Sequence, residues 1–402
     1  LEGLTDLSTS RNLEILPTFT AVQAGSLDTT AGGFREGDAL GETGVGIKYG
    51  ITSNLTMDFT YNPDFSQIEA DQPQVEVNQR FALFYQEQRP FFLEGQEIFA
   101  AATPLNLVHT RTIVDPRFGA KLTGKVGNTT IGVFVTDDEA PSRLADPTSP
   151  VFGRAAQSLI GRVRYDLYAE SYVGAIATAR EFADDYNRVG GVDGRFRLGR
   201  THSLSFAAVG SQHQDAINGR LDGSAIEFDF MRQARNLSYG ASHSSIDPDF
   251  HTETGFVPRV DIRRTDANIG YRWWPESTLL SWGPSFTYLR NYNHAGVLED
   301  EQFRGDVNFE FVRNRRVSAG LSRDLERFGG IDFRKTAYSF RVGLSGPILT
   351  VTGGANRGDG IFFGKHPFLG RSTDGNVGMY YRPTSRLWTE LRTLFSRFVN
   401  PA

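Results

Sequence analysis

Residue types that most often carry catalysis or bind metals are sparse in this 402-residue chain. The absence of cysteine excludes disulfides and thiolate metal sites. The chain contains no Gly-x-Ser-x-Gly elbow and no phosphate loop, and its histidines show neither HExxH nor HxH spacing. There are seven of them, at positions 109, 202, 213, 243, 251, 294 and 366.

Two weaker chemical signals remain. An esterase embedded in a membrane needs adjacent serine and histidine, as at His202–Ser203 and His243–Ser244. Acidic clusters could bind calcium, although solvated loop charge is the simpler interpretation; they lie at Asp137–Glu139, Asp184–Asp185 and Asp247–Asp249. We therefore expect a protein that is not an enzyme and that needs no cofactor and no metal.

Charged residues instead recur at every second position and alternate with apolar ones. Between 159 and 167, the apolar positions Leu159, Val163, Tyr165 and Leu167 alternate with Arg162, Arg164 and Asp166. Between 303 and 311, the apolar positions Phe303, Val307, Phe309 and Phe311 alternate with Arg304, Asp306, Asn308 and Glu310. A strand sorts such residues onto opposite faces, whereas a helix scatters them. The predicted inner-face residues are Lys121, Lys125, Arg162, Arg164, Asp166, Asp193, Arg195, Arg197, Arg304, Asp306 and Glu310. Two interpretations stay open: a selectivity lining for ions or polar solutes, or a self-neutralising network that holds the wall in shape.

The pattern recurs about nineteen times in segments of about 9–13 residues, the length that crosses a bilayer at a tilt. No apolar run reaches the roughly 18 residues of a membrane helix. Predicted connections alternate between long and short; the long ones are 23–40, 62–115, 137–155, 181–187, 215–222, 246–261, 293–300, 326–334 and 358–372. Loop lengths segregated in this way are typical of outer-membrane barrels and not of soluble sandwiches.

The sequence thus predicts an all-β, antiparallel transmembrane β-barrel of about 19 or more strands spanning 1–402, with short periplasmic turns and long extracellular loops. The alternative is a large soluble β-sheet protein. The last predicted strand, about Arg386–Phe398, runs outward, so we expect the natural chain to continue beyond Ala402. A net charge of −5 without a basic block gives no indication of nucleic acid.

Residues 62–115 interrupt the alternation, and they are too long for a simple loop. We expect this stretch to fold inward as a plug or constriction with a small aromatic core, in which Arg89 and Glu94 pair with charged wall residues and Gly95 forms a tight turn. The alternative is a ligand-binding constriction formed by Arg89, Glu94 and Glu97. The predicted plug residues are Phe84, Arg89, Phe91, Phe92, Glu94 and Gly95.

The same stretch resembles a known family. Asn62–Gln72 (NPDFSQIEADQ) and Asn78–Gly95 (NQRFALFYQEQRPFFLEG) are similar to the signature of a large bacterial outer-membrane barrel family of uncharacterised function, departing from it at Tyr85–Gln88. Gly3–Ala21 and Asp249–Arg263 also match. Members commonly carry, ahead of the barrel, a domain similar to family 9 carbohydrate-binding modules. The resemblance implies that this domain and the last strands lie outside the present sequence.

Two functions are expected from these observations. The first is a channel or uptake barrel in the bacterial outer membrane for small polar solutes, with saccharides suggested only by the family's neighbouring domain. The second is a plugged, non-conducting barrel that acts as an anchor or structural subunit of a larger cell-envelope complex. The expected partners are outer-membrane lipid, a small polar solute or saccharide, and other envelope proteins, and no nucleic acid.

Overall fold

The computed structural model describes residues 12–28, 33–63, 80–143 and 145–400, and it consists almost entirely of strands. The strands are β1 (Leu13–Asp28), β2 (Gly33–Thr52), β3 (Leu55–Tyr61), β4 (Pro116–Val126), β5 (Thr129–Asp138), β6 (Ala156–Tyr168), β7 (Ser171–Phe182), β8 (Asp185–Leu198), β9 (His202–Asp215), β10 (Gly219–Gln233), β11 (Leu237–Ile246), β12 (Ile262–Tyr271), β13 (Leu279–Tyr292), β14 (Leu298–Phe311), β15 (Arg315–Phe328), β16 (Ile331–Ser345), β17 (Leu349–Phe362), β18 (Phe368–Tyr381) and β19 (Thr389–Val399). The helical elements are short: α1 (Pro90–Leu93), η1 (Gln96–Phe99), η2 (Thr110–Thr112) and η3 (Ala140–Ser142).

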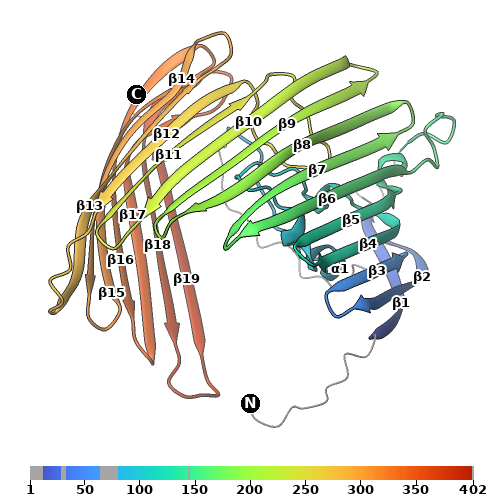
Figure 1. Cartoon of the computed structure of the whole chain (residues 1–402), viewed down its shortest axis with the longest axis horizontal. Helices are drawn as coiled ribbons and strands as arrows, with labels where there is room; N and C mark the ends of the chain where they lie inside the picture. The colour runs from blue at the N-terminus through green and yellow to red at the C-terminus, as the bar shows by residue number, and fades with distance from the viewer. Residues whose placement is uncertain (1–11, 29–32, 64–79, 144, 401–402) are drawn as a thin grey trace.

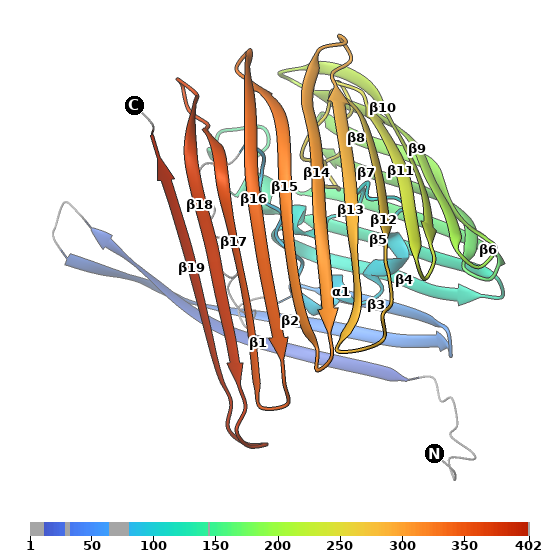
Figure 2. The ribbon, with the colours of Figure 1, turned by 90° about the vertical axis from the view of Figure 1, so that its left-hand side faces the viewer.

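Every register pairing joins strands that follow each other in the chain, and all are antiparallel. The result is one 19-stranded sheet that curves around a central space (Figure 1). Within the described residues β1 pairs only with β2 and β19 only with β18, so these two strands are the edges. Figure 2 shows β1 and β2 crossing the direction of β17–β19 at a steep angle. The predicted all-β class and antiparallel arrangement are confirmed.

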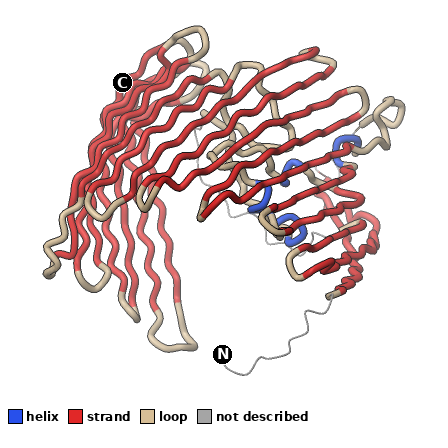
Figure 3. The backbone as a smooth tube through the Cα atoms, in the orientation of Figure 1, coloured by secondary structure: helices blue, strands red, loops and turns tan. Residues whose placement is uncertain are grey.

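The alternation of residue types sets which face of each strand is buried. On β6, Leu159 and Val163 are 51% and 48% exposed, whereas Ile160 and Arg162 are each 1% exposed. The buried set packs against the short helices, which lie on the concave side of the sheet (Figure 3). The apolar set therefore lies on the convex face, as the period of two requires.

The longest connections, 62–115, 139–155 and 247–261, all leave the sheet at the same end because each follows an odd-numbered strand. Six connections expected to be long are clearly shorter, namely 23–40, 181–187, 215–222, 293–300, 326–334 and 358–372. Residues 23–40 belong mostly to β1 and β2, and two-residue turns replace 181–187 and 326–334. Ala183, Gly329 and Gly330 have φ values of 56°, 58° and 79°. Two-residue hairpin turns require such left-handed conformations, so the strands continue almost to the turn.

Among the residues that the structure describes, no helix is both long enough and apolar enough to cross a membrane.

Candidate functional site

The connection between β3 and β4 carries the part of the chain that is not wall. Residues 64–79, which include most of the predicted Asn62–Gln72 motif, lie outside the described residues, and we call residues 80–115 the inner segment. Pro90 lies in the first turn of α1, where its missing N–H costs no hydrogen bond. Gly95 then adopts φ 70°, a left-handed value, between α1 and η1. The sequence interpretation required a tight turn at this position.

Apolar side chains fasten the inner segment to the concave face. Phe92, Phe99, Leu105, Leu107 and Ile113 are each at most 5% exposed. They share one buried cluster with wall residues from β5 to β12, namely Phe134, Ile160, Ile176, Val189, Val209, Ala225, Ile246 and Ile262, and with Phe250 of the connection 247–261. The predicted plug residues Phe91 and Phe92 lie in or against this cluster.

Two wall glycines make room for the aromatic rings. A Cβ atom on Gly119 would lie 2.8 Å from the Phe91 ring, and one on Gly132 would lie 2.8 Å from the Phe99 ring. Phe84 packs elsewhere, with ring centroids 4.9 Å from His109 and 5.3 Å from Phe256. The aromatics that we expected to form one small core therefore divide between two contacts.

Glu94 joins the inner segment to the wall, as the sequence predicted. Its carboxylate lies 2.5 Å from the ammonium of Lys48 on β2. The neighbouring ammonium of Lys121 on β4 donates to the carbonyl oxygens of Phe91 and Glu94, at 2.7 and 2.5 Å, and lies 3.9 Å from Asp58. Lys121 is 4% exposed, so it binds the segment rather than lining an open passage.

The ion pair that the structure describes for Arg89 joins it to Glu87, another residue of the inner segment. Its guanidinium donates two bonds to Glu87, at 2.8 and 2.7 Å, and further bonds to the carbonyl oxygens of Ile113 and Thr110. Thr110 Oγ1 donates at 2.6 Å to Glu87 Oε2, which also accepts one of the two Arg89 bonds. Burial alone would raise the pKa of Glu87, but the bonds from Arg89 and Thr110 outweigh it and lower this pKa to about 2. Arg89 thus joins the two ends of the segment.

Arg162 on β6 and Asp193 on β8 form a buried pair beneath residues 100–102. Their side chains are 0% and 2% exposed, with N–O distances of 2.5 and 2.8 Å. Asp193 also accepts the backbone N–H of Ala102 at 2.7 Å, and Gly174 leaves the space that the pair occupies. Both residues belong to the predicted inner-face set, and the inner segment covers them.

Most of the remaining predicted inner-face charges form ion pairs, some with one another and some with other charged residues. Asp166 contacts Lys125 at 2.5 Å and Arg164 at 3.5 Å, and Arg195 borders the same hollow. Arg197 contacts Glu170, Arg304 contacts Asp306 at 2.7 Å, and Glu310 contacts Arg316 at 3.4 Å. This mutual pairing fits the self-neutralising network better than a single-sign selectivity ring.

A cavity of about 760 Å³ separates the inner segment from β10–β16. Arg80 of the segment reaches Asp300 and Glu326 across it, at 3.1 and 3.2 Å, and Arg259 contacts Asp300 at 2.5 Å. Sequence reasoning missed this cluster because residues 293–300 and 326–334 were assigned to loops. Seven carboxylates against four basic side chains line the cavity; the carboxylates are Glu227, Asp229, Asp266, Asp300, Glu301, Asp324 and Glu326.

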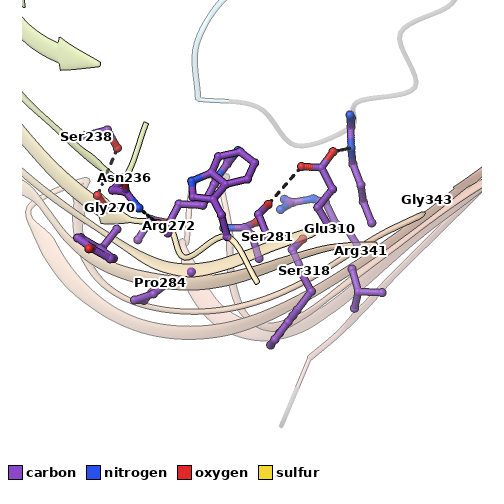
Figure 4. A pocket seen from close by; sticks show the side chains of 18 of the residues that line it. Asn236, Ser238, Gly270, Arg272, Ser281, Pro284, Glu310, Ser318, Arg341 and Gly343 are labelled. Carbon is purple, nitrogen blue, oxygen red and sulfur yellow. Dashed lines mark hydrogen bonds and ion pairs between the residues drawn. The ribbon is translucent and has the colours of Figure 1, made fainter. Parts of the chain in front are cut away.

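A second cavity, of about 990 Å³, lies nearer the short turns of β10–β17. Figure 4 shows its polar lining, with Ser281 donating to Glu310 at 3.4 Å and Asn236 bonded to the carbonyl of Arg272. The larger cavity borders β10–β17 and the smaller one borders β10–β16, so both overlap, at β10–β12, the β5–β12 region where the buried cluster of the inner segment lies.

One cluster among the described residues has the donor set of a metal site. His213 lies near the end of β9, and His251 and Glu253 lie in the connection 247–261. One ligand atom from each lies within 4.8 Å of the others. Spacing in the sequence could not identify it, because the two histidines are 38 positions apart.

Comparison with known proteins finds a family match over part of the chain. A family model described as a domain of unknown function, DUF5916, matches residues 18–126, just over a quarter of the chain. No curated protein matches the chain. Among solved structures, the crystal structure of Acinetobacter baumannii OccAB2 is similar, with 11% identity, a TM-score of 0.41, and coverage of 71% of this chain and 87% of that chain. The family match includes the run from Asn62 to Gly95 that carries the resemblance, and it assigns no activity.

Proposed function

We propose that this chain forms the wall of a bacterial outer-membrane β-barrel through which small polar solutes pass. The observation that carries the proposal is the sorting of side chains between the two faces of the sheet. Large apolar side chains are exposed on the convex face of strands from β6 to β18, among them Leu159, Val163, Phe228, Phe286, Phe303 and Phe340. Such a surface is unfavourable in water and matches lipid.

The two cavities supply the route for a solute. The inner segment covers mainly the concave side of β5–β11, and the cavities of about 760 and 990 Å³ extend along β10–β17. Charged and amide side chains line them, including Glu310, Arg341 and Asn308 in the larger one. These groups can exchange hydrogen bonds with water or with a hydroxylated solute. Saccharides are the solute class that the family resemblance suggests.

Conductance in a planar bilayer tests this function. We expect the wild-type chain to give a steady ionic conductance, and a variant in which a short Gly-Ser linker replaces residues 82–113 to conduct several-fold more. Replacing residues 145–154 of the connection 139–155 in the same way is the matched control, because that stretch contributes no residue to either cavity. Liposome swelling with neutral sugars then measures whether hydroxylated solutes enter.

A second function, a plugged anchor or subunit of a larger envelope complex, is favoured by one observation: the inner segment is fastened by a buried apolar cluster and a buried ion pair. This alternative expects no conductance from the wild-type chain and conductance only after the segment is replaced. A closed wild-type barrel in the bilayer measurement would therefore contradict the channel and favour the anchor.

A further inference from the structure

We propose that His213, His251 and Glu253 bind a divalent transition-metal ion of the zinc class. The three ligand atoms are His213 Nδ1, His251 Nε2 and Glu253 Oε1. Oε1 lies 3.7 Å from His213 Nδ1 and 4.0 Å from His251 Nε2. Two imidazole nitrogens and one carboxylate oxygen form a donor set that zinc prefers, with a fourth position left for water.

The state of His213 is the independent observation that points to an ion. Its side chain is only 4% exposed, and its Nδ1 atom is buried without a hydrogen-bond partner. A buried polar atom without a partner is costly, and native structures rarely leave one. The other ring nitrogen, Nε2, is 2.9 Å from Asp215 Oδ2. A metal-binding histidine is commonly oriented by a hydrogen bond between its other ring nitrogen and a carboxylate. Asp215 occupies that position, which leaves Nδ1 of His213 facing the proposed ion.

The backbone around the other two ligands is held in place. Buried Asn187 on β8 donates to the carbonyl of His251 at 3.0 Å and accepts from the N–H of Glu253 at 2.9 Å. Ser211 on β9 accepts the N–H of His251 at 3.1 Å. The second oxygen of Glu253 is occupied by Arg180 at 2.7 Å, which leaves Oε1 for the ion.

The ligand atoms must close in slightly to bind. Zinc bonds of about 2.0–2.1 Å in a tetrahedron separate ligand atoms by roughly 3.3 Å, and the described separations reach 4.8 Å. The side chain of His251 is 47% exposed, so it is free to turn toward the other two.

The ion would fasten the inner segment indirectly. Thr254, next to Glu253, accepts the N–H of His109 at 2.6 Å, and Phe256 donates its N–H to the carbonyl of Asn106 at 2.9 Å. An ion that joins β9 to the connection 247–261 would therefore also make it harder for residues 106–109 to separate from that connection. This consequence does not depend on whether the barrel conducts.

Zinc titration of the purified chain in detergent, after removal of metals with a chelator, tests the proposal. We expect one zinc ion per chain by calorimetry and by metal analysis, and X-ray absorption showing nitrogen and oxygen neighbours at about 2.0–2.1 Å. His251→Ala should weaken binding by more than about tenfold, and Asp215→Asn by about tenfold or more, the usual effect of losing an orienting partner. His366→Ala is the matched control, because His366 is exposed in another loop.

Hydrogen exchange provides a second measurement. Zinc should slow exchange at residues 106–109 in the wild type and in His366→Ala, and not in His251→Ala. Because His251 is half-exposed, its removal should leave the fold intact, whereas His213→Ala removes a buried ring. Absence of zinc binding, or equal binding by the wild type and His251→Ala, would overturn the proposal.

Discussion

The buried pair of Arg162 and Asp193 lies where the inner segment meets the wall. Both side chains are almost fully buried, and Asp193 also holds the backbone of Ala102. We expect Arg162→Ala to destabilise the folded chain by about 3–5 kcal/mol, because it leaves an uncompensated buried carboxylate. Urea unfolding in detergent measures this, with Arg188→Ala as control, since the Arg188–Glu181 pair is more than half exposed. Equal stability of the two variants would show that the buried pair contributes nothing.

Glu87 gives a pH-dependent prediction at the same scale. Its pKa is lowered from 4.5 to about 2 in the folded chain, by the bonds from Arg89 and Thr110 against the effect of burial. A carboxyl whose pKa is lower in the folded state stabilises that state above its unfolded pKa and loses this contribution as pH falls through its folded pKa. The difference in unfolding free energy between the wild type and Glu87→Gln should therefore be constant from pH 7 to about 5, and it should shrink as pH falls from about 4.5 toward 2. A difference that does not change with pH would contradict the assignment.

Gly132 is the element-scale position where wall and inner segment fit together. A Cβ atom there would lie 2.8–2.9 Å from Phe99 and Ile98 of η1. We expect Gly132→Ala to weaken the docking of η1 by about 1–3 kcal/mol through overpacking, and to speed protease cleavage within residues 96–105. Gly161→Ala is the control, because a Cβ there meets only a backbone oxygen at 3.9 Å. Equal cleavage rates in the two variants would mean that η1 does not rely on this contact.

At the scale of elements, the sequence predicted strands better than their ends. Alternation identified β6 and β14 because it reflects a local geometric constraint. The two-residue turns at 183–184 and 329–330 were not predicted. The strand ends next to them carry many polar residues, which do not show the alternation of apolar and polar positions that identifies a strand. The inner segment was found as a break in the pattern. Its contacts were only partly predictable. Glu94 pairs with Lys48 on the wall, as a charge facing the wall should. Arg89 pairs with Glu87, and this contact depends on the local conformation of the segment, which a repeating pattern in the sequence does not reveal. The cluster of His213, His251 and Glu253 depends on the pairing of distant strands.

The charge of the smaller cavity gives a prediction for the whole molecule. Its lining carries seven carboxylates and four basic side chains. We expect the open wild-type barrel to favour potassium over chloride in a salt gradient, because fixed negative charge raises the local cation concentration. Asp324→Asn should reduce this preference, since Asp324 lines the cavity, whereas Asp146→Asn in the connection 139–155 should not. Chloride preference in the wild type would contradict a route through this cavity.

The central claim for the whole molecule is that the convex face meets lipid and the concave face meets water. The chain has no cysteine, so a single introduced cysteine can be labelled without competition. Positions 303 and 307 lie on one face of β14, and 304 and 306 lie on the other, where Arg304 pairs with Asp306. An arginine at the lipid midplane costs about 2–4 kcal/mol, so the wall has one stable register in a bilayer.

The environment of each face can be measured with a fluorophore attached to a single cysteine at each of these four positions. The liposomes contain either a lipid-attached quencher or an aqueous quencher. We expect the lipid-attached quencher to act at 303 and 307 and the aqueous quencher at 304 and 306; the opposite pattern, or aqueous quenching at all four, would contradict the membrane barrel.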